Sequence, residues 1–95
     1  MVIVEDLLTL KEKIIKLKGK RITKEFDKWL VKQYIRDDMP DFYSNIIAEL
    51  MTELEGLQVE KIEKGSRDLK GISFSIPYLN LIIKKIDKKL LVNLQ

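Results

Sequence analysis

The chain contains neither cysteine nor histidine. It therefore lacks the thiolate nucleophile, the imidazole base and the common zinc ligands, so catalysis would have to rest on carboxylates, lysine, tyrosine or serine. Gly19-Lys20 has neither the upstream glycine nor the following Ser or Thr of a phosphate-binding loop. The acids Asp37, Asp38 and Asp41 are explained by helix capping around a proline, without a bound cation. The sequence predicts a protein that is not an enzyme and holds no cofactor and no metal.

Glycine and proline are scarce, with four and two residues, and no long apolar run occurs. These counts exclude collagen-like and low-complexity chains. Because the apolar runs are far shorter than the ~20 residues that a membrane-spanning helix needs, we expect no such helix and no membrane partner. The acidic N-terminus differs from a signal peptide, and the lack of cysteine suits a reducing compartment, so we expect a cytoplasmic protein. Abundant Lys, Glu and Ile with few Asn and Gln is also typical of heat-adapted proteins.

The 95 residues, 45% of them apolar, suit a single domain. Apolar residues recur at helical spacing in the stretches 6–18, 23–36 and 42–56. Gly19 closes the first stretch, Thr23 is a suitable N-cap for the second, and Pro40 separates the second from the third. We therefore expect three N-terminal helices, the last ending at Gly56.

The pattern changes after Gly56. A turn is expected at residues 65–68, and residues 72–76 alternate apolar and polar side chains as a half-buried strand does. Residues 78–95 fit either a hairpin that turns near Asp87 or an amphipathic helix, and we prefer the hairpin because Pro77 has no evident capping residue before it. The predicted fold is α+β. Three helices of a helical half, 1–56, pack on an antiparallel sheet of three or four strands in a β-rich half, 57–95, with a C-terminal hairpin.

Charge is unevenly distributed along the chain. Residues 11–36 hold ten Lys or Arg against three acids, residues 37–68 hold nine acids against three bases, and residues 69–95 hold five lysines against one acid. A basic block can neutralise phosphates without base specificity, although a solvated helix surface explains the same pattern. We predict a small accessory protein that contacts nucleic acid non-specifically. The expected contact residues are basic and form two clusters: Lys16, Lys18, Lys20, Arg21, Lys24 and Lys28, then Lys84, Lys85, Lys88 and Lys89.

The acidic third helix gives an alternative. Its expected exposed acids would repel a phosphate backbone, so we do not expect this helix to read DNA. Glu49 and Glu53 could instead dock a basic protein partner, or the polarised chain could associate with itself. The alternative prediction is a protein-interaction module or an accessory subunit of a larger assembly. Trp29, Tyr34, Tyr43 and Tyr78 would be candidate contact residues if they lie outside the core.

Overall fold

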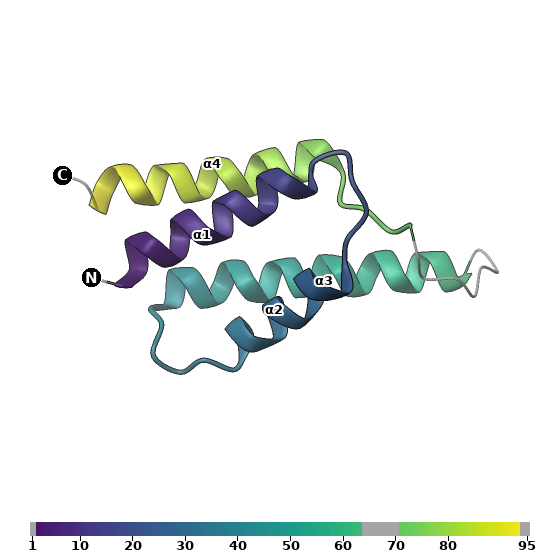
Figure 1. The fold of residues 1–95 in the computed structure, drawn as a ribbon, viewed down its shortest axis with the longest axis horizontal. Helices are drawn as coiled ribbons and strands as arrows, with labels where there is room; N and C mark the ends of the chain where they lie inside the picture. The colour runs from purple at the N-terminus through teal and green to yellow at the C-terminus, as the bar shows by residue number, and fades with distance from the viewer. Residues whose placement is uncertain (1, 64–70, 94–95) are drawn as a thin grey trace.

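The structure is a computed structural model that describes residues 2–63 and 71–93. Within these two ranges the chain forms four helices (Figure 1): α1 (Val2–Leu17), α2 (Lys24–Tyr34), α3 (Asp41–Glu63) and α4 (Ile76–Asn93). None of the described residues lies in a β-strand. The predicted α+β fold with an antiparallel sheet is therefore wrong, and the described part of the chain is all-helical.

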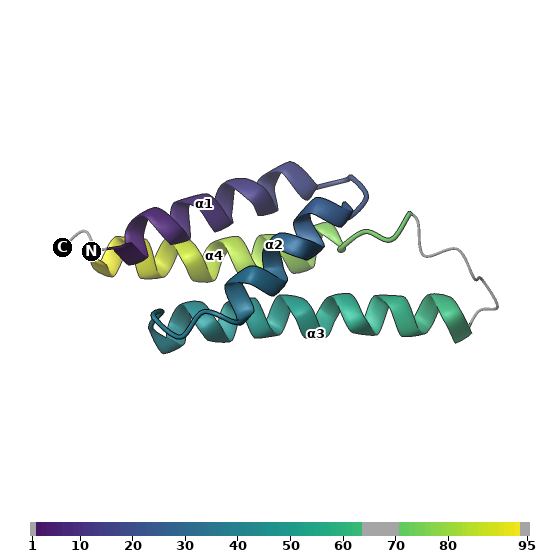
Figure 2. The same cartoon turned by 60° about the horizontal axis from the view of Figure 1, so that its bottom comes forward.

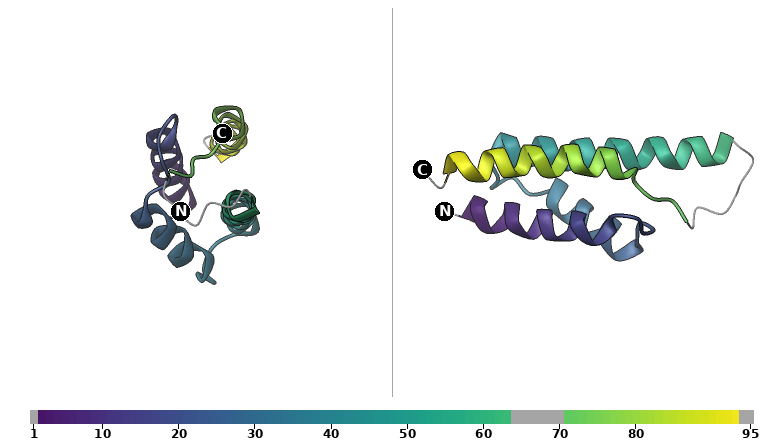
Figure 3. Two further views of the ribbon diagram at one scale, coloured as in Figure 1. Left: turned by 90° about the vertical axis from the view of Figure 1, so that its right-hand side faces the viewer. Right: turned by 90° about the horizontal axis from the view of Figure 1, so that it is seen from above.

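The helices form an elongated bundle that measures 49 × 27 × 18 Å. Helices α1 and α4 run side by side in opposite directions, while the short α2 crosses α3 at an angle (Figure 2). Seen end-on, the four helices occupy the corners of a four-sided arrangement in the order α1, α4, α3, α2 (Figure 3, left). Consequently α2 and α4 lie at diagonally opposite corners and face different directions.

All four helices contribute to one apolar core. In each helix the buried residues recur every three or four positions, which places them on one face. Burial of such faces against each other removes apolar surface from water and is the main force that holds the bundle together. The fully buried aliphatic residues are Leu7, Leu10 and Ile14 in α1, Leu30 in α2, Ile47 and Leu50 in α3, and Leu79, Ile82 and Ile86 in α4.

The first three helices agree with the sequence analysis at most of their ends. Thr23 is the N-cap of α2, since its Oγ1 accepts a hydrogen bond from the backbone N of Phe26 at 3.0 Å. Gly19, with a φ of 69°, follows the end of α1, as expected for a glycine beyond a helix C-terminus. The predicted end of the third helix at Gly56 is wrong, because α3 continues to Glu63. A glycine inside an exposed helix costs only about 1 kcal/mol relative to alanine, which the flanking turns offset.

The predicted strand at residues 72–76 and the predicted hairpin at residues 78–95 are the main error, because the described residues there form a non-helical segment followed by α4. Ile72 and Phe74 are buried and their neighbours exposed, so the alternation is real. However, this stretch does not form a β-ladder. It contacts the segment before α2 through one backbone hydrogen bond, from Ile22 N to Ile72 O at 2.7 Å. Ser75 then caps α4, since its Oγ accepts from Tyr78 N at 3.2 Å. Pro77 lies in the first turn of that helix, where a backbone N–H has no helical partner.

The predicted β-rich half, 57–95, is consequently wrong wherever the structure describes it. Residues 57–63 belong to α3 and residues 76–93 to α4. The predicted turn at 65–68 lies outside the described residues. No helix in the described ranges combines the length and the apolar character needed to cross a membrane.

Candidate nucleic-acid interface

Helix α2 is fixed to the bundle by its inner face. Phe26 and Leu30 are buried in the core, and the Phe26 ring packs edge-on against Phe74 at a centroid distance of 6.4 Å. Trp29 is half-buried and lies beneath the Lys13 ammonium, 5.0 Å from its ring centroid, which joins α2 to α1. The orientation of α2 about its own axis is therefore set by large side chains, and its opposite face points to solvent.

That outer face carries a row of lysines. Lys24, Lys28 and Lys32 recur at intervals of four residues, so they lie one above the other on one side of the helix, and all three are exposed. The described residues provide no ion-pair partner for any of them. From Lys24 to Lys32 the row spans about 12 Å along the helix axis. Three ammonium groups thus stand along one line with their charge facing water.

The turn between α1 and α2 carries further cations. Lys20 and Arg21 are exposed and lie three and two residues before the N-cap of α2, and the half-exposed Lys18 directly follows α1. Lys16 is exposed but lies 3.4 Å from Glu12 on the same helix. The α2 N-terminus itself is poorly suited to an anion, because Thr23 already occupies the Phe26 amide and Glu25 and Asp27 are acidic residues of the first turn.

The lysines of α4 do not join the α2 row. Lys85 reaches across to α3, where its Nζ donates to both carboxylate oxygens of Glu49 at 3.2 and 3.3 Å. Lys89 lies over the Phe42 ring, 5.4 Å from its centroid. Lys84 and Lys88 are exposed, on the helix diagonally opposite α2 (Figure 3, left). The fold therefore separates the two predicted clusters, and two of the four α4 lysines contact side chains of α3.

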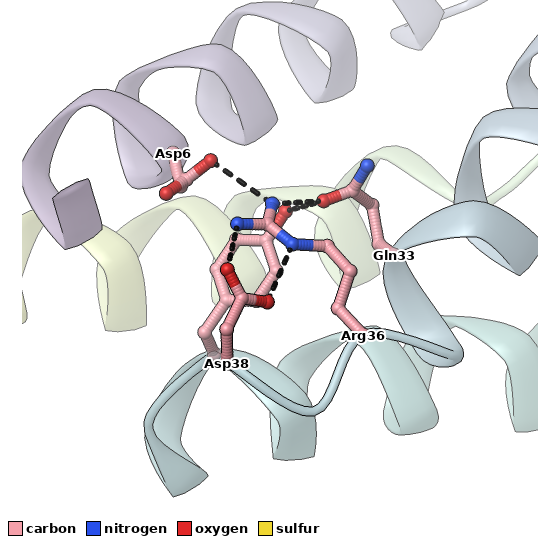
Figure 4. A network of polar contacts seen from close by, with 5 residues as sticks. Asp6, Gln33, Arg36 and Asp38 are labelled. Carbon is pink, nitrogen blue, oxygen red and sulfur yellow. Dashed lines mark hydrogen bonds and ion pairs between the residues drawn. The ribbon is translucent and has the colours of Figure 1, made fainter.

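Arg36 belongs to the basic block in sequence but is used inside the fold (Figure 4). Its guanidinium donates to both oxygens of Asp38 at 3.1 Å, to Asp6 Oδ1 on α1 at 3.2 Å and to Gln33 Oε1 at 2.9 Å. The Tyr43 hydroxyl on α3 donates to the same Gln33 oxygen at 2.6 Å. One arginine thus ties the C-terminal end of α2 to α1 and α3, and holds the end of the lysine row in place.

The charges of this network shift the acidity of its members. The hydrogen bonds from Arg36 lower the pKa of Asp38 and raise the pKa of Arg36 itself, so the pair stays ionised. Burial raises the pKa of Tyr43 to about 12, and the nearby carboxylate of Asp6 acts in the same direction. The hydroxyl therefore remains a hydrogen-bond donor at neutral pH.

Some acidic residues of α3 already form contacts within the molecule. Glu49 holds Lys85, and its backbone carbonyl accepts from the Tyr78 hydroxyl at 3.4 Å. Burial, followed by the charges of Glu49 and Glu53, raises the pKa of that Tyr78 hydroxyl. Glu53 is half-exposed, whereas Glu55 is exposed. Within the described residues no group of three or more acids is placed to hold a metal ion.

Sequence reasoning missed one member of the row. Lys32 was counted in the basic block but left out of the expected contact residues, although it stands four positions after Lys28. The periodic signal 24, 28, 32 could have found it, because that spacing places three side chains on one helix face. Comparisons with protein-family models, with curated proteins and with solved structures find no match for this chain.

Proposed function

We propose that the chain is a non-enzymatic accessory protein that contacts nucleic acid through the outer face of α2. The observation that carries this proposal is the exposed row of Lys24, Lys28 and Lys32, which has no acidic partner among the described residues. Lys20 and Arg21, in the turn before the helix, are also exposed. Each amine that meets a phosphate releases a condensed counterion, and this release favours binding.

The dimensions suit a phosphate backbone. A row of about 12 Å is long enough to meet about three phosphates of one strand of a duplex. Long lysine side chains can adjust to this spacing without reading bases, so the contact positions the protein but does not select a sequence. We therefore expect similar affinity for unrelated sequences of the same length.

A protein partner at Glu49 and Glu53 is less favoured as a function. The charge of Glu49 is balanced by Lys85, and Glu53 is half-exposed, so these two acids present little net negative charge to a partner. The lysines of the α2 row have no such balancing charge among the described residues. For this reason nucleic acid is the better candidate.

Fluorescence anisotropy with short labelled DNA and RNA, duplex and single-stranded, tests the proposal. The chain should bind at low salt, and three phosphate contacts on duplex DNA predict a slope of log K against log salt near about −3. Affinity should vary little between sequences. Absence of binding to all four probes at low salt would remove the proposal.

A further inference from the structure

A second face of the bundle, formed by α1 and α4, carries exposed apolar side chains beside charges of opposite sign. On α1 the exposed residues Leu8, Glu12 and Ile15 form one stripe. On α4 the exposed residues are spaced three, four and three apart, which also makes a stripe. They are Leu81, Lys84, Lys88 and Leu91.

The two stripes lie next to each other. Lys11 of α1 forms an ion pair with Asp87 of α4, 2.6 Å apart, at the seam between the two helices. Leu8 and Ile15 flank Lys11 on its helix face, and Lys84 and Leu91 flank Asp87 on its own. The stripes therefore form one surface across the seam, on the side of α1 that faces away from α2.

We propose that this α1/α4 face binds the same face of a second copy of the chain. The charges of the two stripes are complementary, because the α1 stripe carries a glutamate and the α4 stripe carries two lysines. A two-fold axis parallel to the helices places α1 of each copy over α4 of the other. The α1–α4 contact therefore occurs twice in the dimer. The surface is then complementary to itself.

The register agrees with this pairing. The ion pair places Asp87 within side-chain reach of Lys11, and the helices are antiparallel, so Glu12 lies near the stretch of α4 that carries Lys84 and Lys88. In the same arrangement Leu8, nearer the N-terminus of α1, lies towards the C-terminal end of α4, which carries Leu91.

At the other end of the stripes, Ile15, near the C-terminus of α1, lies towards the N-terminal half of α4, which carries Leu81. These apolar residues are 47 to 61% exposed in the single chain. Their burial would drive association, and the charges would fix its register.

Glu12 already lies 3.4 Å from Lys16 on its own helix, in an exposed pair. Such surface pairs contribute little and exchange partners readily, so this contact does not prevent an intermolecular one. The inference is also separate from the nucleic-acid proposal. Helix α2 occupies the corner diagonally opposite α4, so a dimer of this kind leaves the α2 lysine row of each copy uncovered (Figure 3, left).

Charge exchange between two variants tests the dimer. Sedimentation velocity over roughly 1 μM to 1 mM, the range of weak to moderate self-association, should show the unaltered chain passing from monomer to dimer. Glu12→Lys alone should be monomeric at concentrations where the unaltered chain is dimeric, and so should Lys84→Glu/Lys88→Glu. Mixing these two variants should restore a dimer, because every contact between them is again attractive.

Glu55→Lys, an equal charge reversal at an exposed site on α3, is the matched control and should dimerise like the unaltered chain. Circular dichroism confirms that each variant is folded. A chain that stays monomeric over the whole range overturns the proposal. Dimerisation that survives both reversals, or a mixture that stays monomeric, overturns it as well. None of these outcomes bears on nucleic-acid binding, which is measured separately by fluorescence anisotropy with short labelled DNA and RNA.

Discussion

The lysines of α2 and those of α4 look alike in sequence but differ in their use by the fold. Both sets are exposed to some degree, yet Lys85 and Lys89 of α4 contact Glu49 and Phe42 of α3, whereas Lys24 and Lys28 of α2 face water along one line. Charge density along a chain therefore does not locate a binding surface. Helical spacing, together with the partners that neighbouring helices provide, does.

The largest expected difference between the two sets of lysines is in duplex affinity after each set is neutralised. In Lys24→Gln/Lys28→Gln/Lys32→Gln we expect roughly 100-fold weaker binding of a short duplex at about 50 mM salt, because three phosphate contacts are lost. Lys84→Gln/Lys85→Gln/Lys88→Gln removes the same charge on the diagonal helix and should weaken binding only about two- to threefold through long-range attraction. Anisotropy titrations with a probe that covers a single α2 compare them, and equal losses would break the distinction.

Arginine 36 sharpens the comparison, because it is a cation of the basic block that serves the fold. Arg36→Met removes the guanidinium that donates hydrogen bonds to Asp6, Asp38 and Gln33. It should lower the free energy of unfolding by about 2 kcal/mol. The control Lys28→Met, at an exposed site, should change it by no more than about 0.5 kcal/mol. Urea denaturation measures both, and a small loss in the Arg36 variant would contradict this structural role.

Tyr43 makes the same network sensitive to alkali. Its pKa is raised in the fold, so the neutral form is favoured there, and the stability it contributes is complete below its unfolded pKa of about 10. This contribution is lost as pH rises towards the folded value of about 12, by about 1 kcal/mol at pH ~11. Between pH ~9 and ~11 the Tyr43→Phe variant should lose less stability than the unaltered chain. Parallel thermal melts would show equal losses in the two chains if the hydroxyl were exposed, because its pKa would then be the same in the folded and unfolded states.

The smallest effect is expected at Lys85. Its pair with Glu49 is exposed on both sides, so Lys85→Gln should cost about 0.5 kcal/mol or less. Binding of the short duplex should stay within about twofold, because this ammonium faces α3 and not the α2 row. A larger change in affinity than in unfolding free energy would assign Lys85 to the interface.

The sequence predicted the helical first half well, because periodicity and caps are local signals. Thr23 and Gly19 mark helix ends through their own chemistry, and the structure places both as expected. The prediction for the C-terminal segment was wrong because its apolar residues fit both the two-residue period of a strand and the 3.6-residue period of a helix. Ser75, two positions before Pro77, was the overlooked cap, and with it the stripe of Leu79 and Ile82 becomes the buried face of α4.

The candidate site was less predictable than the fold. The basic block in residues 11–36 could be read from the sequence, but which amines face water depends on tertiary contacts. Arg36 turns inward because Asp6 and Tyr43 arrive from α1 and α3, and Lys85 is held because α3 lies beside α4. No local pattern carries that information.

Mapping the contact by NMR tests the central claim most directly. A nitrogen-15-labelled chain titrated with a short duplex at low salt should show shift changes concentrated at residues 20–32, on the outer face of α2 and the turn before it. These changes should fade as salt is added. Changes centred on residues 84–89 of α4, or none at a saturating duplex concentration, would contradict the proposal that α2 carries the interface.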